Sequence, residues 1–591
     1  MKISDSKIFR RMPGWGTCVA GLSTVVLLIR MQRFYAGSDL AIFAASCALE
    51  LLLLDLTTRL ALRLHGVPLR GLGLALPLFG GCIYMAQLYS IWISGGLIPP
   101  IAFANQEVVG LIAFDGIYAL LATFLVAFIG YACLVRTAPN APLSRGALVG
   151  GMLVLAAGYA AVLAAQPLAR GIVVARGEAP VSSFLRSAAT YAGMNGRAQL
   201  SAAELIEARA EFSRRAVYQQ GFPEELTRAL PHRPNVLVIF TEGMSARWMD
   251  TYGSVHPGVT PNLDRLADGS LVFRNYYNHT AATFRGLRGQ LTSGHQEVDG
   301  YNQEGTGIGQ RDVSNDVTAI SRISIPEVLR AQGYRSIFFL SQQEYLNKMI
   351  ETLGFDRVLG RDYLYDHYLR GTSASDRPKY LSDSELFDTL LTELEAQPDD
   401  QPFFAAAYNF QTHAFLDGEE PYGNGDNRLL NRFHTYDRDV GRLLDRFMAS
   451  RLHENTLLVF TADHSTFPSP NAVRADDRVE GYFVDTIPLL MYWKGAEHRM
   501  IDVAGKNSLD LAPSLISLLG VKKAHNLFLG CTFFEQCALD RVSNIGVEYI
   551  LTDGDGSYSE YYVPPSQKKR YEESKRAIER YKSMDLVIDA R

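Results

Sequence analysis

Cysteine is scarce in this sequence, and a surplus of basic residues is missing. Of the 591 residues, 6 are cysteine, and 57 Lys and Arg stand against 62 Asp and Glu, which gives a net charge of −5. No basic stripe is visible, so the chain is not expected to bind nucleic acid. Four of the cysteines lie in apolar stretches and the other two come late in the chain, so no cysteine is a candidate nucleophile.

Length and hydropathy divide the chain into several parts. A chain of 591 residues is too long for a single hydrophobic core, so two or more units are expected. The N-terminal part is strongly apolar, and the remainder has the composition of an ordinary water-soluble domain. We expect four segments: a transmembrane domain at 1–167, an amphipathic linker at 168–230, a catalytic domain at 231–540 and a charged tail at 541–591.

The apolar part contains five stretches that are long enough to cross a bilayer, which takes roughly 20 residues each. They lie near 15–33, 39–60, 72–97, 108–135 and 147–167. Lys and Arg gather in the loops on one side, and the loop between the third and fourth stretches has none, although Arg30 and Arg33 do not follow this pattern. The positive-inside rule then places everything after the fifth stretch outside the cytoplasm. No short, cleavable signal peptide is visible, so the first stretch is expected to be an uncleaved anchor.

Acidic residues occur inside or near the ends of these stretches, at Glu50, Asp55 and Asp115. Acidic groups in a membrane are functional hypotheses by default. The alternative is a structural role, in which they make polar contacts between helices or, for Asp55, pair with Arg59 one turn along. We favour the structural role.

The linker and the tail each carry one clear local signal. In the linker, Ser201 and Glu204 form a capping box that begins an amphipathic helix, which lies either on the membrane surface or on the following domain. In the tail, residues 566–591 are dense in charge and are expected to form a solvated helix that packs along one face.

From residue 235 onward, buried strands alternate with amphipathic helices. The expected strands are 235–240, 336–340, 403–410, 456–460 and 487–493. The expected helices are 260–269, 324–333, 385–396, 433–448 and 508–520. Ser324 and Glu327 form a second capping box, and Gly520 is expected to end the last helix. This order predicts an α/β domain with a mostly parallel sheet, whose ligands bind beyond the carboxyl ends of the strands.

Polar and reactive residues follow three of the expected strands. Glu242 comes after the first, Thr412 and His413 after the third, and Asp463 and His464 after the fourth. Alone, Glu242 fits a charge at a helix N-terminus, and Asp463 fits a capped loop. Together, two carboxylates and an imidazole at one sheet edge predict a site for a divalent metal such as Zn²⁺ or Mn²⁺.

A hydroxyl nucleophile is available between the first two strands. The stretch 276–294 offers four candidates, which are Thr280, Thr283, Thr292 and Ser293. A hydroxyl is a poor nucleophile at neutral pH. A metal ion lowers the pKa of a bound water from about 15.7 to roughly 7, and it favours the alkoxide form of a coordinated hydroxyl in the same way. The expected chemistry is covalent catalysis at a phosphorus centre.

The order of these motifs resembles the alkaline-phosphatase superfamily. The similarity is specific in five stretches, which are 236–243, 252–277, 282–287, 461–464 and 484–493. It is strongest to the membrane-anchored lipoteichoic acid synthase and phosphoglycerol transferase branch, whose members have five N-terminal spans and one external sulfatase-like domain. The resemblance implies that Glu242, Thr283, Asp463 and His464 bind the metal, which is Mn²⁺ or Zn²⁺, or else Mg²⁺.

The same resemblance implies a reaction and a location. Thr283 is the nucleophile that the family pattern indicates, and His413 is the substrate-contacting histidine. The threonine takes the head group of a membrane phospholipid, most simply phosphatidylglycerol, and passes it to an extracytoplasmic glycan or glycolipid. The protein is then a multi-pass protein of a bacterial inner membrane with an extracytoplasmic catalytic domain.

The sequence departs from the family at several points. The branch holds its substrate with an arginine shortly before an F-G-x-D turn, but the stretch 343–351 before Gly354–Asp356 has no arginine, so Asn347 or Lys348 is expected to take its place. This keeps a phosphoethanolamine transferase open as an alternative, although the residues after Asp463–His464 lack the run typical of that group. Sulfate-ester hydrolysis is not expected, because Thr283 does not stand in a C-x-P-x-R or S-x-P-x-R motif.

Two further alternatives remain open. One is a degenerate member of the family that binds a lipid or a partner without catalysis, and the other is a phosphodiesterase that transfers the head group to water. Cys531 and Cys537 lie in the external part, where disulfides persist, and we predict that they pair; two free thiols are the alternative.

Overall fold

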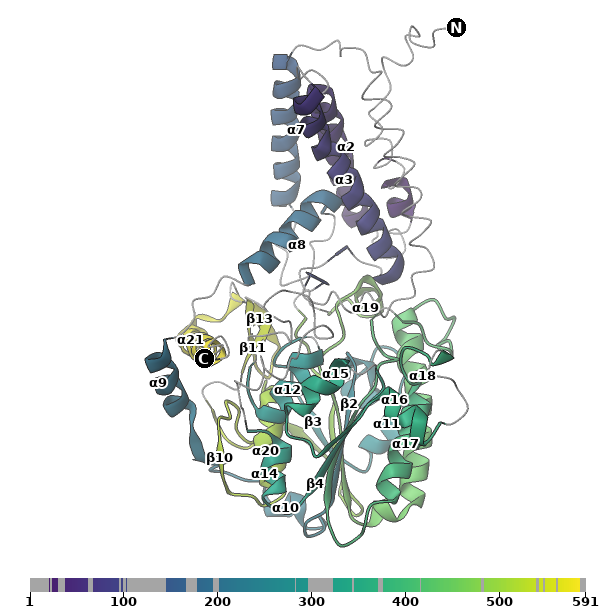
Figure 1. The fold of residues 1–591 in the computed structure, drawn as a ribbon, viewed down its shortest axis with the longest axis vertical. Coiled ribbons are helices and arrows are strands. Elements are labelled where there is room, and N and C mark those ends of the chain that lie inside the picture. The colour runs from purple at the N-terminus through teal and green to yellow at the C-terminus, as the bar shows by residue number, and fades with distance from the viewer. Residues whose placement is uncertain are drawn as a thin grey trace. The chain divides into compact units, whose positions relative to one another are not determined.

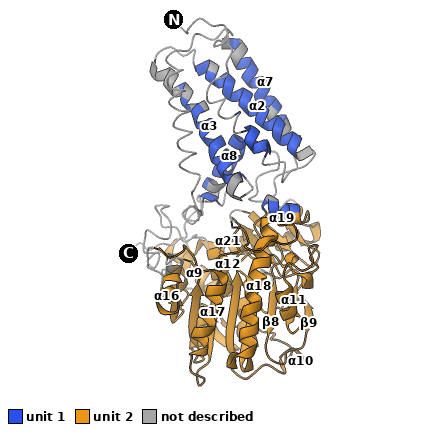
Figure 2. Ribbon diagram, turned by 90° about the vertical axis from the view of Figure 1, so that its right-hand side faces the viewer, with its two compact units in different colours: residues 1–195, 469–474 blue, residues 196–468, 475–591 orange. Residues whose placement is uncertain are grey.

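The structure is a computed structural model of the 591-residue chain. It describes residues 21, 24–29, 38–61, 67–94, 97–98, 102–103, 145–165, 178–194, 201–281, 283–295, 323–342, 345–369, 376–414, 416–479, 483–537, 541–545, 548–559 and 562–584. The chain forms two compact units, coloured separately in Figure 2. The first comprises residues 1–195 with 469–474, and the second comprises 196–468 with 475–591.

Most described residues of the first unit are helical. Its main helices are α2 (Ser38–Ala61), α3 (Val67–Ser94), α7 (Arg145–Ala165) and α8 (Pro180–Met194). Among the described residues, one segment is long and apolar enough to cross a membrane, Leu40–Thr58 in α2. Shorter apolar segments lie at Leu78–Ile91 in α3 and Val149–Gly158 in α7. The five-span prediction is therefore not confirmed, and most of its first and fourth stretches fall outside the described residues.

Glu50 has a structural partner inside this unit. Its carboxylate accepts hydrogen bonds from the backbone N–H groups of Val181 (3.0 Å) and Ser182 (2.9 Å). These groups belong to the first turn of α8, where backbone donors have no partner within the helix and a negative charge is favourable. Glu50 therefore caps α8 from the middle of α2, as the structural role predicted.

The second unit is built on an eight-stranded sheet (Figure 1). In spatial order its strands are β5 (Arg357–Leu359), β4 (Arg335–Leu340), β6 (Phe403–Tyr408), β2 (Asn235–Thr241), β7 (Thr456–Ala462), β8 (Leu489–Tyr492), β3 (Leu271–Arg274) and β9 (Arg499–Asp502). The sheet is mixed, because β8 runs antiparallel to β7 and β3 while the other neighbours are parallel. The mostly parallel sheet was predicted, and the reversal of β8 was not.

Two groups of helices cover the sheet. One group contains α11 (Pro261–Ala267), α17 (Asp383–Glu395) and α18 (Arg428–Ala449), and the other contains α12 (Thr283–Thr292), α14 (Ile325–Arg330) and α20 (Leu511–Leu518). Figure 1 shows them on opposite sides of the strands, and helices of each group pack on one another. The central strands are buried on both faces, which is why they read as continuous apolar runs in the sequence.

The helix boundaries follow the signals in the sequence. Both predicted capping boxes are present, at Ser201 with Glu204 and at Ser324 with Glu327. Ser201 begins α9 (Ala202–Phe212), which packs on the C-terminal helix α21 (Lys568–Ser583) through an edge-to-face contact of Phe212 with Tyr581. The first capping box therefore begins a helix that packs within the second unit. Gly520 ends α20 with a φ of 79°, a backbone conformation that favours glycine.

The C-terminal segment is more structured than its charge suggests. Before α21 it forms a three-stranded antiparallel sheet of β11 (Val542–Ile545), β12 (Glu548–Thr552) and β13 (Ser557–Ser559), which was not predicted. The helix α21 buries Tyr571, Ile578 and Tyr581 along one face, as predicted for a solvated helix packed on one side.

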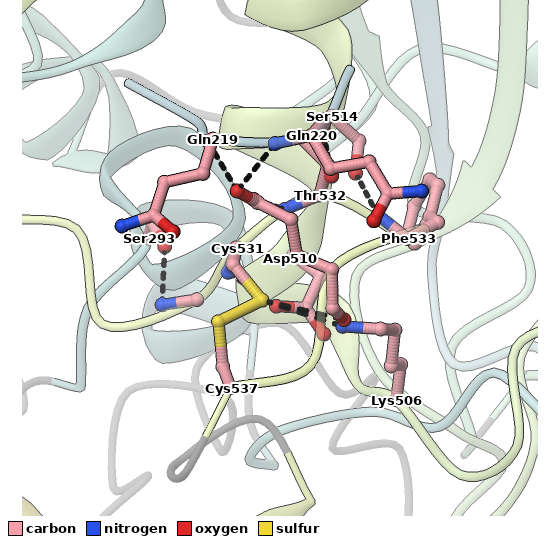
Figure 3. The surroundings of a disulfide bond; sticks show 12 residues. Gln219, Gln220, Ser293, Lys506, Asp510, Ser514, Cys531, Thr532, Phe533 and Cys537 are labelled. Carbon is pink, nitrogen blue, oxygen red and sulfur yellow. Dashed lines mark hydrogen bonds between the residues drawn. A yellow bond between two sulfur atoms is a disulfide. The ribbon is translucent and has the colours of Figure 1, made fainter. Parts of the chain in front are cut away.

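A disulfide joins Cys531 to Cys537, as predicted. Figure 3 shows that the loop it closes is tied to several parts of the domain. The backbone N–H of Cys531 donates to Asp510 Oδ1 (2.8 Å), and that of Phe533 donates to Ser514 Oγ (3.0 Å). The backbone N–H of Gly530 donates to Ser293 Oγ (2.9 Å), close to the end of α12. The bridge therefore holds a loop that supports the helices on one side of the sheet.

The disulfide gives a direct chemical prediction. The chain has six cysteines, so a Cys531–Cys537 bridge leaves four that react with an alkylating reagent after denaturation without reductant, and six after reduction. Intact-mass analysis counts the labels. Six labels without reductant would contradict the bridge, and a Cys531→Ser, Cys537→Ser variant serves as the control because it takes four labels in both conditions.

Candidate metal centre and nucleophile

The carboxyl ends of three adjacent strands bring the candidate residues together. β2 lies between β6 and β7, and the register pairs Phe240 with Tyr408 and Thr241 with Ala462. Glu242 follows β2 directly, and Asp463 follows β7 directly. Parallel strands in register end at the same edge, so residues about 220 positions apart become neighbours in space.

Glu242, Asp463 and His464 form a compact, buried group. One ligand atom from each lies within 4.8 Å of the other two. His464 Nε2 is 3.5 Å from Glu242 Oε1 and 3.4 Å from Asp463 Oδ2. Ligand atoms about 2.0–2.1 Å from a tetrahedral ion are roughly 3.4 Å apart, so these separations suit a divalent cation.

The hydrogen bonds around the group leave suitable lone pairs for such a cation. Asp463 Oδ1 accepts from the backbone N–H groups of Gly243 (2.9 Å) and His464 (2.7 Å), whereas the buried Oδ2 has no hydrogen-bond partner among the described residues. His464 Nδ1 lies 2.8 Å from the carbonyl oxygen of Ser465, which only accepts, so Nδ1 carries the proton. The lone pair of Nε2 then faces the two carboxylates, and the donor set fits a metal.

The electrostatics of the group lead to the same conclusion. Desolvation and the nearby charge of Glu242 raise the pKa of Asp463. Desolvation lowers the pKa of His464, but the carboxylates of Asp463 and Glu242 outweigh it and raise that pKa overall. Two buried carboxylates this close repel each other and need a positive charge, which either a protonated His464 or a bound cation supplies.

Of the four candidate nucleophiles, Thr283 is the one whose hydroxyl bonds a residue of this group. It is the first residue of α12, and its Oγ1 donates to Glu242 Oε2 at 2.9 Å. The N-terminus of a helix favours a phosphate group, because its backbone N–H groups and dipole face the anion. Thr283 thus combines a nucleophile position, a carboxylate partner and a site for negative charge.

The other three hydroxyl candidates point elsewhere. The hydroxyl of Thr280 donates to the carbonyl of Asn544 at 2.8 Å, and that of Thr292 donates to the carbonyl of Arg288 at 2.8 Å. Ser293 Oγ accepts from the backbone N–H of Gly530, the residue just before Cys531. The structure therefore separates Thr283 from Thr280, which the sequence alone did not.

The helix α12 packs closely against the chain segment that carries Asp463 and His464. Gln290 Nε2 donates to the carbonyl oxygens of Ala462 (2.9 Å) and Asp463 (3.1 Å). A Cβ at Gly286 would lie 2.3 Å from Asp463 O, so only glycine allows this approach. The position of the nucleophile relative to the metal ligands depends on this contact.

His413 follows β6, which lies on the opposite side of β2 from β7. The preceding Thr412 donates through Oγ1 to the carbonyl oxygen of Glu242 (2.8 Å), and His413 stacks on Phe410 with ring centroids 4.8 Å apart. Desolvation lowers the pKa of His413 to about 4, although the charge of Glu242 opposes this shift. His413 is therefore neutral at pH 7 and within electrostatic reach of Glu242.

The two expected substitutes for the missing arginine lie on α15 (Tyr345–Glu351). Asn347 is buried against Gly360 beyond β5, at the far edge of the sheet, three strands from β2. The side chain of Lys348 falls outside the described residues. The structure therefore does not place either residue beside the metal ligands.

Two further residues at the site were missed in the sequence. Tyr408, the last residue of β6, donates from its hydroxyl to Glu242 Oε2. Arg432 on α18 is buried and donates through Nη1 to the carbonyl oxygens of Ala414 (3.1 Å) and Leu416 (2.7 Å), just after His413. Desolvation lowers the pKa of Arg432 to about 10, so it stays charged at pH 7. Tyr408 was visible as a polar end to an apolar run, whereas Arg432 gave no signal within its helix.

Comparison with known protein families gives a match over the part of the chain that holds this site. Residues 234–521 match the model of the Sulfatase family, a span that contains Glu242, Thr283, Asp463 and His464. Residues 234–521 are therefore similar to the Sulfatase family.

Relatives of this domain act on different groups. Phosphoglycerol transferase I of Xanthomonas campestris pv. campestris is 25% identical over 322 residues, which cover 49% of this chain and 41% of that protein. Arylsulfatase A of Homo sapiens is 25% identical over 351 residues, which cover 49% of this chain and 65% of that protein. The chain thus spans less than two thirds of either relative.

Two solved structures from bacteria are among those similar to this chain. The lipoteichoic acid synthase LtaP from Listeria monocytogenes has a TM-score of 0.46 at 16% identity, covering 66% of this chain and all of that one. A member of the alkaline phosphatase superfamily from Vibrio parahaemolyticus has a TM-score of 0.47 at 18% identity, covering 66% of this chain and 97% of that one.

The ligand set predicts how metal content responds to substitution. Asp463→Asn and His464→Ala should each lower the metal bound per chain, because the remaining groups cannot complete the coordination shell. The measurement is elemental analysis of the purified full-length protein after equilibration with Mn²⁺ or Zn²⁺. His453→Ala is the control, because this histidine bonds Tyr492 far from the site. Full metal occupancy in an Asp463→Asn, His464→Ala double variant would falsify the proposed site.

Proposed function

We propose that the protein is a metal-dependent transferase that moves a phospholipid head group through a phospho-threonine intermediate. The observation that carries this proposal is the hydroxyl of Thr283, bonded to Glu242 within a buried group whose donor set suits a divalent cation. A hydroxyl nucleophile, a metal site and a helix N-terminus are what transfer of a phosphorus centre requires.

The reaction has two displacement steps. In the first, Thr283 Oγ1 attacks the phosphorus of the phospholipid, the bond to the diacylglycerol oxygen breaks, and diacylglycerol leaves with a proton. In the second, an acceptor hydroxyl attacks the same phosphorus, the bond to Thr283 breaks, and the threonine regains a proton. When bound, the divalent ion would lower the pKa of the threonine hydroxyl and offset the charge on the phosphate oxygens.

The surrounding residues hold the reactants. Glu242, Asp463 and His464 would hold a bound ion, and Gln290 fixes α12, whose first residue Thr283 bonds Glu242. His413, neutral at pH 7, donates a hydrogen bond to the phosphate. Arg432 braces the turn after His413 and adds a positive charge on this side of the site, which supports binding of an anionic diester.

A phosphodiester is a better candidate substrate than a sulfate ester. Arylsulfatase A is as similar to the chain as the phosphoglycerol transferase is. However, sulfatases use a C-x-P-x-R or S-x-P-x-R motif at the nucleophile, and here Thr283 is followed by Phe-Arg-Gly-Leu. A threonine nucleophile therefore supports the phosphoryl reaction.

We infer that the donor is phosphatidylglycerol and that the acceptor is an extracytoplasmic glycan or glycolipid. The motif order and the transferase relative support this donor. The apolar helix at Leu40–Thr58 supports a membrane location, which we propose to be multi-pass in a bacterial inner membrane. Phosphatidylethanolamine is the second donor candidate, because the stretch 343–351, just before the turn at Gly354–Asp356, has no arginine. The complete set of Glu242, Thr283, Asp463 and His464 argues against a non-catalytic scaffold.

The nucleophile is tested by substitution of the two neighbouring threonines. Thr283→Ala should lower the rate of diacylglycerol release by at least 10³-fold, on the order expected for loss of a covalent nucleophile. Its thermal unfolding temperature should stay close to that of the native protein. Thr280→Ser is the matched control, because serine keeps the hydroxyl that bonds Asn544. Near-normal turnover in Thr283→Ala would show that the assignment is wrong.

The donor is tested with labelled lipids. Purified full-length protein in detergent with Mn²⁺ should release diacylglycerol faster from phosphatidylglycerol than from phosphatidylethanolamine. Mass spectrometry should find a glycerophosphate adduct on the peptide that contains Thr283, and none in Thr283→Ala. An ethanolamine-phosphate adduct there, with no response to phosphatidylglycerol, would overturn the donor and keep the mechanism. Transfer of the label to water alone, with a glycan acceptor present, would identify a hydrolase.

A further inference from the structure

Tyr408 meets the metal centre from the strand on the opposite side of β2 from Asp463. It is the last residue of β6 and pairs with Phe240, so it emerges at the same edge of the sheet as Glu242. Its side chain is fully buried. A buried phenol needs a partner for its hydroxyl, and the end of a strand fixes where that hydroxyl lies.

The hydroxyls of Tyr408 and Thr283 bond the same carboxylate oxygen of Glu242. Both donate to Glu242 Oε2, Thr283 at 2.9 Å, and the two hydroxyl oxygens are 3.3 Å apart. The other carboxylate oxygen, Oε1, faces His464 Nε2 at 3.5 Å. The two oxygens of Glu242 therefore have separate surroundings: one is held by hydroxyl groups and the other faces the metal group.

Among the described residues, side chains rather than backbone groups bond the carboxylate of Glu242. The main chain of Glu242 is held by Asn409, which accepts from its N–H (2.8 Å), and by Thr412, which donates to its carbonyl (2.8 Å). Neither contact involves the carboxylate. Rotation of the carboxylate about its terminal bond is soft, so hydrogen bonds decide which oxygen faces the ion.

We propose that Tyr408 is a positioning residue that fixes the Glu242 carboxylate, so that Oε1 is presented to the metal and Oε2 to the nucleophile. This inference deepens the proposed function, because it rests on the same metal centre, but it needs neither the phospholipid donor nor the acceptor. Among the described residues, Thr283 is the remaining donor to Oε2 when the phenol hydroxyl is removed, and its bond is lost whenever Thr283 reacts. Tyr408 then keeps the metal ligand in place throughout the two steps.

A second buried tyrosine provides a matched control. Tyr436 on α18 is as buried as Tyr408, and its hydroxyl is 2.8 Å from Thr241 Oγ1, one residue before Glu242. Removing either hydroxyl leaves a ring of the same shape and deletes buried hydrogen bonding beside β2. For Tyr408 this includes the contacts of its hydroxyl with Thr283 Oγ1 (3.3 Å) and Gln342 Nε2 (3.5 Å), as well as the bond to Glu242. Only Tyr408 contacts the metal group, so the two variants separate a loss of stability from a loss of positioning.

The experiment measures Mn²⁺ binding to the full-length protein in detergent by calorimetry. Tyr408→Phe should weaken Mn²⁺ affinity by about 10-fold or more, the range found when a group that orients a metal ligand is removed. Tyr436→Phe should stay within about twofold of the native value. Combined with Glu242→Gln, the Tyr408→Phe change should have no further effect on Mn²⁺ affinity, because the residue through which it acts is already altered.

Kinetics and unfolding complete the test. Tyr408→Phe should lower kcat for diacylglycerol release with little change in KM, because the phenol does not contact the lipid. Native Mn²⁺ affinity in a folded Tyr408→Phe protein, or an equal loss in both single variants, would overturn the positioning role. A native protein that binds Mn²⁺ but releases no diacylglycerol would refute the transferase, and the binding comparison between the two tyrosine variants would still decide the role of Tyr408.

Discussion

Parallel, in-register pairing of β6, β2 and β7 is the constraint on which the rest of the site depends. Each of these strands ends in residues that do not continue the apolar run, and the pairing brings Tyr408, Glu242 and Asp463 to one edge. The strands are buried on both faces, so their register is held by packing as well as by backbone hydrogen bonds. A slip of one residue would turn every side chain to the opposite face and separate the ligands.

The negative charge of the two carboxylates at this edge needs a positive charge that the strands themselves do not provide. Glu242 and Asp463 are both buried, and the hydrogen bonds to Asp463 Oδ1 leave its Oδ2 without a donor among the described residues. Repulsion between the carboxylates and the loss of hydration make this arrangement costly without a cation. Such a cost is typical of a functional site, where local stability is given up for a geometry that binds an ion.

The helices α12 and α18 provide the residues of the site that do not lie at strand ends. α12 places Thr283 over the metal group because Gly286 allows it to approach the backbone of Asp463, and Gln290 bonds that backbone. α18 contributes Arg432, whose guanidinium holds the turn that follows His413. The nucleophile and the substrate-side residues are therefore fixed by helix packing, while the metal ligands are fixed by the sheet.

The sequence alone determined the α/β order, five of the strands, two of the capping boxes and the group Glu242, Asp463 and His464, because each rests on a local pattern or on the rule for strand ends. The cysteine pair followed from the expected external location. The third capping box, at Ser382 with Glu385, was not predicted. Apart from the family resemblance, which indicated Thr283, the residues did not separate Thr283 from Thr280, because both lie in one short stretch and only packing decides that Thr280 bonds Asn544. Asn347 was expected beside the substrate but lies against Gly360 at the far edge of the sheet, since sequence proximity to a turn says little about strand order. Tyr408 and Arg432 joined the site only through the tertiary structure, because their partners lie on other strands and loops, and long-range contacts of this kind leave no periodic signal in the chain.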